Sequence, residues 1–103
     1  MATVIDITNK IKNEDKFIMY NGKSYKVDDR KNTIVKVYSL IDNADGASLE
    51  MIEDVMKLLI GKEAVKDFDG FHYEDYLVPF FVAMACVQNK TYEEVESSFR
   101  ASK

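Results

Sequence analysis

The pair Asn21-Gly22 constrains the fold of this 103-residue chain more than any other feature of its sequence. It separates residues 16–20 from residues 23–27, two short runs in which apolar and polar side chains are mixed. Asn-Gly is the preferred pair for a type I′ turn, because both central residues of that turn need a positive φ. Tyr25 and Val27 share one face of the second run. Since an isolated hairpin is marginal in water, we predict that residues 16–28 form a β-hairpin that packs on something else.

The residues before the hairpin fit two structures. Residues 3–8 are β-branched and partly alternating, which is typical of a short strand or of an extended arm. Residues 9–15 are polar apart from Ile11 and indicate a linker. We therefore expect an N-terminal arm or short strand over residues 1–15, and a strand here would give the sheet three strands.

Helical periodicity dominates the rest of the chain. The predicted helices cover residues of about 30–43, 49–60, 62–68 and 73–88, followed by a last helix that opens at Thr91. We expect Asp28 and Asp29 to cap the first helix and Ser48 to cap the second, because these side chains accept hydrogen bonds from free N–H groups. Gly61 stands where a left-handed cap would end the second helix.

Residues 73–88 form the most apolar segment, which predicts a central helix contacted on several sides. Pro79 lies inside it, where its ring lacks an N–H and crowds the preceding turn. The helix either begins near Val78 or continues through Pro79 with a bend. We favour the continuous helix, since the apolar period keeps its phase. Thr91 and Glu94 then have the spacing of a capping box.

These segments predict one domain over residues 1–103 of mostly helical α+β class. Its parts are the arm or strand of residues 1–15, the hairpin of residues 16–28, and a helical body of four or five helices over residues 30–100. No apolar run approaches the roughly 20 residues that cross a bilayer, and the N-terminus lacks a signal-peptide core. We expect a soluble cytoplasmic protein with no membrane partner.

Charge is unevenly distributed along the chain. Residues 1–36 hold 8 basic and 5 acidic side chains, hence +3, whereas residues 37–103 hold 6 basic and 13 acidic ones, hence −7. A net charge of −4 disfavours nucleic-acid binding, which depends on Lys and Arg neutralising phosphates. The basic third suits an acidic surface instead, including one on another copy of the chain. Exposed strand edges of the hairpin can also pair between copies, so the sequence does not decide between a monomer and a homo-oligomer.

No motif for catalysis or metal binding stands out. His72 lies just before a helix with no nucleophile at a recognisable spacing, and Cys86 lies in an apolar helix typical of an inert buried thiol. The acidic pairs lack the spacing of a calcium loop, and helix starts and exposed helix faces explain them: Asp28/Asp29, Glu53/Asp54 and Glu93/Glu94. We expect no enzymatic activity, no cofactor and no metal.

Large amphipathic side chains are abundant. Most of the tyrosine, phenylalanine and methionine side chains belong to a core, but Tyr and Met at the ends of apolar stripes are also typical of protein-binding surfaces. The composition therefore favours an interaction module over a catalytic one.

The hairpin and the helix after it resemble the opening of a known family. Residues 17–29, Phe-Ile-Met-Tyr-Asn-Gly-Lys-Ser-Tyr-Lys-Val-Asp-Asp, followed by Lys31-Asn32-Thr33, are similar to the tail assembly chaperones of Gram-positive siphophages and prophages. Residues 61–65, 80–85 and 91–96 and Phe99 follow the same plan, so the resemblance covers about residues 16–99. Pro79 departs from that pattern.

The resemblance implies a non-enzymatic chaperone that binds and solubilises the tape-measure protein and helps to recruit tail-tube subunits in the bacterial cytoplasm. Masking an amphipathic helix would use an apolar groove. We expect Tyr76, Phe80 and Met84 of the central helix, with Tyr92 of the last helix, to bind the partner. The alternative is a small phage or bacterial adaptor or regulatory domain that binds another protein.

Overall fold

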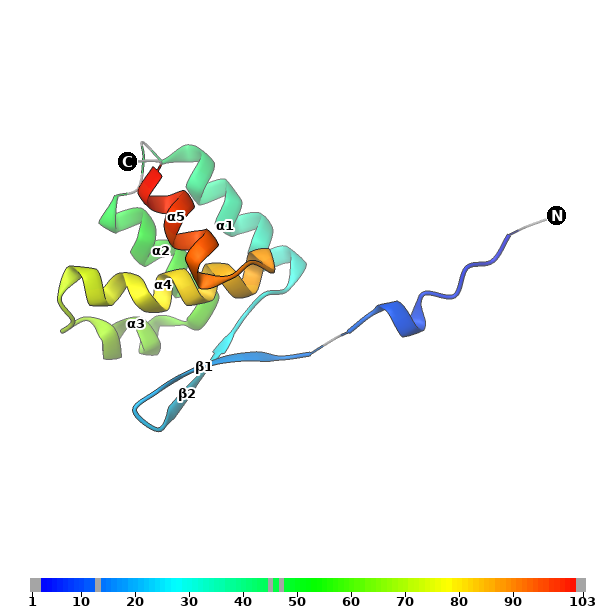
Figure 1. Cartoon of the computed structure of the whole chain (residues 1–103), viewed down its shortest axis with the longest axis horizontal. Coiled ribbons are helices and arrows are strands. Elements are labelled where there is room, and N and C mark those ends of the chain that lie inside the picture. Colours follow the sequence, from blue (N-terminus) through cyan, green and yellow to red (C-terminus); the bar gives the residue numbers. More distant parts are fainter. Residues whose placement is uncertain (1–2, 13, 45, 47, 102–103) are drawn as a thin grey trace.

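An antiparallel β-hairpin followed by five helices makes up the fold (Figure 1). The computed structural model describes residues 3–12, 14–44, 46 and 48–101. The elements in chain order are β1 (Lys16–Tyr20), β2 (Lys23–Val27), α1 (Lys31–Asn43), α2 (Leu49–Ile60), α3 (Lys62–Phe68), α4 (Tyr73–Gln88) and α5 (Tyr92–Ala101). The predicted mostly helical α+β class is confirmed, and the helix ranges agree with the apolar periodicity of the sequence.

The hairpin has the turn that the sequence predicts. Asn21 and Gly22 both adopt positive φ, 52° and 82°, as a type I′ turn requires. Tyr20 pairs with Lys23 and Ile18 with Tyr25, so one face of the hairpin carries the buried side chains. Among the described residues the sheet has two strands, and a third strand over residues 3–8 is not formed.

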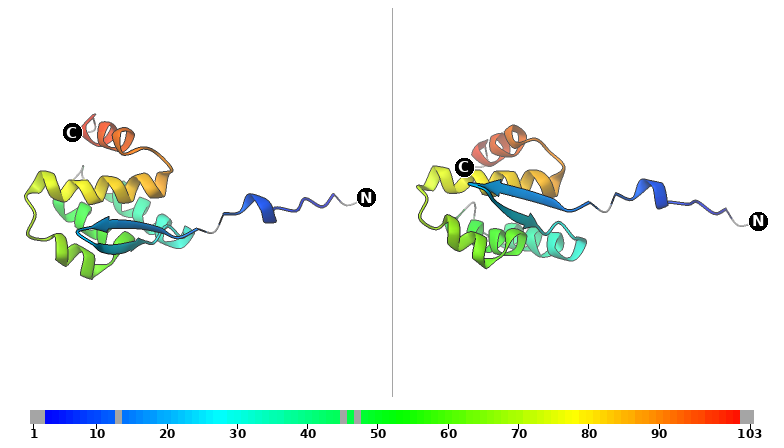
Figure 2. Two further views of the ribbon diagram at one scale, coloured as in Figure 1. Left: turned by 60° about the horizontal axis from the view of Figure 1, so that its bottom comes forward. Right: turned by 90° about the horizontal axis from the view of Figure 1, so that it is seen from below.

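Residues 3–12 form an extended arm with a single 3-10 turn at Thr8–Lys10. The arm continues the line of β1 away from the helices, and Figures 1 and 2 show it clear of the helical body from three directions. The molecule is therefore elongated, with principal extents of 60 × 34 × 24 Å. Of the two structures expected for this segment, the arm is the one observed.

The start of α1 differs from the expected cap. The residue at the cap position is Arg30, and its side chain makes no capping hydrogen bond. Asp28 instead accepts hydrogen bonds from the backbone and side chain of Arg30 and from the Thr33 hydroxyl, at 2.8 Å for the last. The bond from the Arg30 side chain is the main reason that the pKa of Asp28 lies well below its usual range. Asp29 pairs with Lys16, so neither aspartate caps the helix directly.

Both predicted features of α2 are present, with one correction. The Ser48 hydroxyl accepts a hydrogen bond from the Met51 N–H at 3.1 Å, as an N-cap does. Gly61 has the expected positive φ of 91°, but its ψ of 162° is extended and not that of a left-handed cap. The reason is that Gly61 also begins α3, so the chain must turn from one helix directly into the next.

Helix α4 runs unbroken through Pro79 and lies at the centre of the core. The buried apolar side chains come from the hairpin and from every helix. They form one cluster: Ile18, Tyr25, Val27, Val37, Ile52, Val55, Met56, Leu59, Ala64, Val65, Phe68, Tyr76, Leu77, Phe80, Phe81, Ala83, Met84 and Val95. Cys86, expected to be buried, is half-buried at the edge of this cluster.

The last helix opens with the predicted capping box. The Thr91 hydroxyl accepts from the Glu94 N–H and the Glu94 carboxylate accepts from the Thr91 N–H, both at 3.1 Å. Val95 of α5 is buried, which confirms the apolar stripe of that helix. Over the described part of the chain, no helix has the length and apolar character needed to cross a membrane.

Candidate functional site

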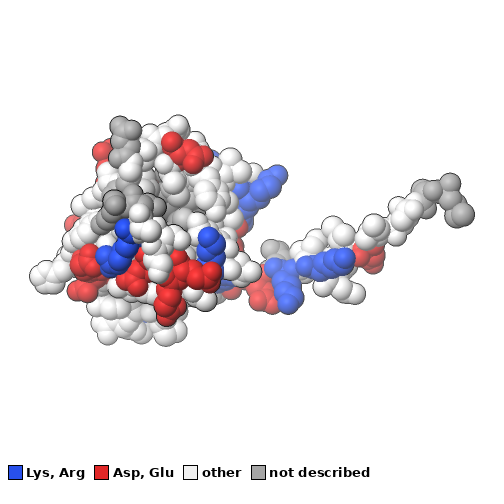
Figure 3. Space-filling model, turned by 45° about the horizontal axis from the view of Figure 1, so that its top comes forward, with Lys and Arg blue, Asp and Glu red and all other residues white. Residues whose placement is uncertain are grey.

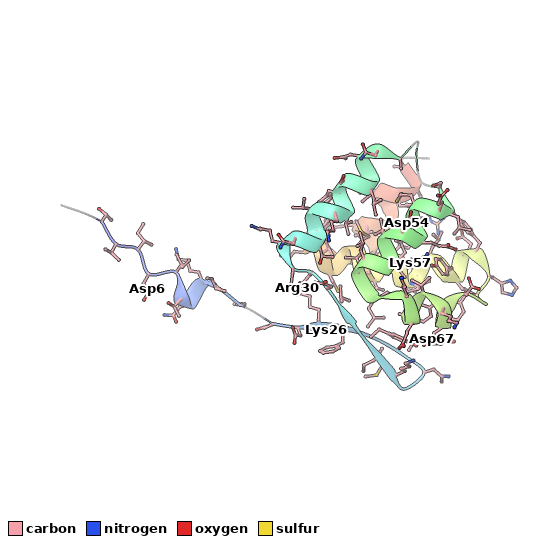
Figure 4. The ribbon with its side chains drawn as sticks, turned by 180° about the vertical axis from the view of Figure 1, so that it is seen from behind. Asp6, Lys26, Arg30, Asp54, Lys57 and Asp67 are labelled. Atoms are coloured by element: carbon pink, nitrogen blue, oxygen red, sulfur yellow. The ribbon has the colours of Figure 1, made fainter. Side chains whose placement is uncertain are left out.

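The hairpin lies across the helical body, with β1 against α4 and β2 against α2 (Figure 2). Polar contacts hold it there. The Asp28 N–H donates to the Leu59 carbonyl at 2.6 Å, and the Lys16 ammonium donates to the Cys86 carbonyl at 3.0 Å. The Tyr25 hydroxyl donates to Asp67 of α3, which lies beside the hairpin in Figure 4. These contacts position β1 beside α4 and so shape the space between them.

That space is an apolar groove of about 650 Å³. Residues of β1, the segment from α3 to α4, and the first half of α4 line it. We call it the hairpin groove, and its lining residues are Phe17, Ile18, Met19, Tyr20, Phe68, Gly70, Phe71, His72, Asp75, Val78, Pro79 and Val82.

Aromatic rings form one end of the hairpin groove. The Tyr20 ring meets the ring of Phe71 edge-on at 5.3 Å between centroids and that of Phe68 at 5.8 Å. Phe68 is fully buried, whereas about half of Tyr20 is exposed. Edge-on ring pairs are a favourable packing of aromatic side chains, so this end of the groove is a packed apolar surface.

The side chains along β1 and α4 are the accessible part of the groove. Met19 is 73% exposed, and Phe17 and Val78 are also exposed although they are apolar. His72 and Asp75 add polar groups at the lining, and both are exposed. An apolar groove with a few polar groups is suited to holding an apolar segment of a partner, since burying such a segment removes both surfaces from water.

The four residues predicted to bind a partner lie elsewhere. Tyr76, Phe80 and Met84 are 5%, 4% and 5% exposed and belong to the core, so they form no open groove. Tyr92 is half-buried, with its ring edge-on against that of Phe81 at 5.7 Å between centroids. The physical reason is that α4 is apolar on several sides: α2 and α5 pack against it, and Tyr76, Phe80 and Met84 are buried while Val78 stays exposed.

Tyr76 nevertheless has an unusual environment. Its hydroxyl is fully buried and has no hydrogen-bond partner among the described residues. Burial disfavours the charged phenolate and raises the pKa of Tyr76 to about 12, helped by the nearby carboxylates of Glu53 and Asp69. A buried hydroxyl without a hydrogen bond lowers the stability of the fold, so Tyr76 is a destabilising residue of the core rather than a binding residue.

Sequence reasoning missed Phe17 and Val78 as surface residues. The signal for Phe17 was present in the register: if Ile18 and Tyr25 face the core, then Phe17 and Met19 must point the other way. No comparable signal existed for Val78, because a helix that is apolar all round does not show which side its neighbours leave open.

The histidine and the acidic pairs considered for catalysis or metal binding lie at helix starts or on the surface. His72 is exposed and precedes α4 without making a side-chain cap bond. Of the acidic pairs, Asp28 and Glu94 are engaged at helix starts. No group of three or more His, Cys, Asp or Glu side chains within the described ranges is placed to hold a metal ion.

A second hollow lies between α1 and α2 and has a volume of about 670 Å³. Exposed Val35 lies in it beside half-buried Leu40 and Leu58. Lysines surround these apolar side chains, and Lys57 and Asp54 mark the place in Figure 4. This hollow differs from the hairpin groove in having charged side chains among its apolar ones, which makes Val35 a useful control position.

The acidic side chains gather on the helical body. Figure 3 shows a band of Asp and Glu side chains on one face of the body, with a few Lys and Arg side chains among them, while the arm carries side chains of both signs.

Comparisons of this chain with protein-family models, with curated proteins and with solved structures give no match.

Proposed function

We propose that this protein is a non-enzymatic tail assembly chaperone that binds and solubilises a phage tape-measure protein in the bacterial cytoplasm. The observation that supports it best is the hairpin groove, an apolar hollow with exposed Met and aromatic side chains on an otherwise acidic body. A tape-measure protein is long, helical and apolar on one face. Such a helix is insoluble alone. A partner that covers its apolar stripe and adds net negative charge would raise its solubility.

The groove suits the recognition of many similar segments. A methionine side chain such as that of Met19 is flexible and polarisable, so it adapts to different apolar side chains, and the packed rings of Tyr20 and Phe71 add apolar surface beside it. A chaperone that covers a long helix must bind successive stretches of different sequence. Recruitment of tail-tube subunits would use another face of the protein.

The alternative proposal is a small phage or bacterial adaptor that uses the same groove for a different protein. Gene order separates the two. A very long reading frame for a helical protein directly downstream supports the chaperone, and its absence from the neighbourhood contradicts that function.

The direct test is co-expression of the full chain with the product of that downstream reading frame. The chaperone should keep the long protein in the soluble fraction and co-purify with it. The variants Met19→Lys and Val78→Lys place a charge in the groove and should each lose at least about tenfold of the co-purified protein, because a buried unpaired charge is strongly unfavourable.

Val35→Lys is the matched control, since it puts the same charge on an exposed valine of α1. It should co-purify as the unchanged chain does. Thermal unfolding of all three variants checks that each remains folded. Full co-purification by both groove variants would reject the groove, and an insoluble long protein in the presence of the unchanged chain would reject the chaperone function itself.

A further inference from the structure

The N-terminal arm carries apolar side chains that touch no part of the helical body. Val4 is 89% exposed and Ile5 71% exposed, and Ile7 and Ile11 are exposed as well. Four branched aliphatic side chains along ten residues are costly to leave in water. The arm is extended and β-branched, which favours pairing with a strand.

Strand β1 has a free edge that can accept such a pairing. Tyr20 and Lys23 flank a two-residue turn and are therefore a hydrogen-bonded pair. Because the pairs alternate, Phe17 and Met19 belong to non-hydrogen-bonded pairs, and their backbone N–H and C=O groups face away from β2. No other strand in the described part of the chain pairs with that edge.

The free edge of β1 and the hairpin groove belong to the same region, since residues of β1 line the groove together with Val78 and Val82 of α4. A strand added to this edge would lie over the α4 side of the groove. One face of the new strand would then contact Val78 and Val82, and the other would face water.

The arm fits this place in length, pattern and charge. Residues 3–7 precede the 3-10 turn and equal β1 in number, and Ile7, at φ −99° and ψ 0°, would become extended when it pairs. Ile5 and Ile7 share one face of that stretch and would contact the groove, while Asp6 points to the opposite face. Lys10 and Lys12 follow in the arm, and their positive charge complements the exposed Asp75 of the groove lining.

The direction of the arm selects a second molecule as the acceptor. Asp15, just before β1, pairs with Lys26 of β2 at 3.5 Å. This contact keeps the chain beside the open end of the hairpin, and the arm leaves in line with β1, away from its own groove (Figures 1 and 2). To reach that groove the arm of the same molecule would have to reverse direction.

We propose that residues 3–7 of one copy add as a third strand to the free edge of β1 in a second copy, with Ile5 and Ile7 in its hairpin groove. Reciprocal exchange closes a two-fold dimer, and one-way exchange builds a chain of copies. The arm protects the groove when no partner protein is bound. This inference goes beyond the proposed function because it concerns the protein alone, whatever the partner of its groove is.

The test is the mass of the full chain in solution by light scattering and sedimentation, over a range of concentrations. The unchanged chain should associate to two or more copies. The double variant Ile5→Asp/Ile7→Asp should be a monomer at the same concentrations, since each carboxylate would be buried without a partner. Val35→Asp, an equal change on the exposed face of α1, should associate normally.

A second variant tests the acceptor edge. Met19→Pro removes an N–H that faces away from β2, so the hairpin keeps its own hydrogen bonds while the added strand loses one. This variant should also be a monomer. Mixed with Ile5→Asp/Ile7→Asp it should form a dimer, because one variant keeps a normal arm and the other a normal edge.

Two outcomes would overturn the proposal. One is a wild-type monomer at every concentration, including a monomer whose Ile5 and Ile7 amides are protected from hydrogen exchange, which would mean that the arm folds back on its own hairpin. The other is a double variant that associates as strongly as the unchanged chain. Neither outcome depends on the tape-measure protein, so failure here is distinct from failure of the proposed function.

Discussion

The Tyr25 hydroxyl donates a hydrogen bond to the Asp67 carboxylate at 2.9 Å, which ties strand β2 to helix α3. The same carboxylate oxygen accepts from the Lys23 ammonium at 2.7 Å. The bond from Lys23, followed by that from Tyr25, lowers the pKa of Asp67 and thus favours its charged form in the folded protein. The contact between the hairpin and α3 therefore depends on pH through the charge of Asp67.

Asp67→Ala should lower the melting temperature at neutral pH, because it removes the acceptor for the Lys23 and Tyr25 side chains of the hairpin. A carboxylate whose pKa is lowered by folding stabilises the protein above its ordinary value of 3.8, and that contribution is lost as the pH falls through the folded value. The difference between variant and wild type should therefore shrink as the pH falls below that ordinary value. Thermal unfolding followed by circular dichroism measures both.

Asp42→Ala is the matched control for that change, since Asp42 is an exposed aspartate of helix α1. Its melting temperature should stay close to that of the wild type at every pH. A pH-independent effect of Asp67→Ala would show that the charge on Asp67 does not stabilise the hairpin.

Tyr76→Phe should raise the free energy of unfolding at neutral pH by about 1–3 kcal/mol, because it removes a buried hydroxyl that has no partner among the described residues. The effect has a second signature. Folding raises the pKa of Tyr76 from 10.0 to about 12, so the unfolded chain ionises first and the wild type loses stability as the pH rises from 10 toward 12. The variant should lose less stability than the wild type over that range.

Denaturant unfolding at pH 7 and at several alkaline values checks this prediction. Tyr38→Phe, on the exposed side of α1, is the control and should change neither value. A lower free energy of unfolding for Tyr76→Phe at neutral pH would mean that its hydroxyl has a hydrogen-bond partner after all.

Gly61→Ala should destabilise the protein by about 1–3 kcal/mol, because a φ of 91° with an extended ψ is a conformation that side chains with a Cβ rarely adopt. Open space surrounds the position, so backbone strain is the only cost. Gly70→Ala has equal space without a positive φ and should stay within about 0.5 kcal/mol of the wild type. Equal effects at the two glycines would contradict the strain at Gly61.

Ser48→Ala should cost about 1 kcal/mol, because it removes the acceptor for the Met51 N–H at the start of α2. Ser97→Ala, at an exposed position inside α5, is the control and should be neutral or slightly stabilising, since alanine favours helix. Urea unfolding of both variants measures the difference. Similar losses in the two would show that the cap contributes nothing to α2.

Local signals predicted most of the elements because their causes are local. Asn21-Gly22 provides the two positive φ angles of the turn, and Thr91 and Glu94 satisfy each other's backbone donors whatever surrounds them. Asp28 and Gly61 were predicted less well. The Asp28 carboxylate accepts hydrogen bonds from the Arg30 and Thr33 side chains instead of capping the helix. Gly61 ends α2 and begins α3, so the next helix decided its backbone conformation.

The candidate site depended on contacts between distant segments and was predicted poorly. Tyr76, Phe80 and Met84 were recognised as large apolar side chains of one helix, but periodicity does not show which side of an apolar helix its neighbours cover. The hairpin groove exists because β1, more than fifty residues away along the chain, lies beside the open side of α4.

The sequence by itself therefore determined the hairpin, the helices and the separation of basic from acidic residues, since turn chemistry, capping and apolar period act within a few residues. Only the tertiary structure decided that Met19 and Val78 are exposed beside the groove and that the buried Tyr76 hydroxyl has no partner among the described residues. Burial is set by whichever segment packs against a side chain, and that segment lies far away in the sequence.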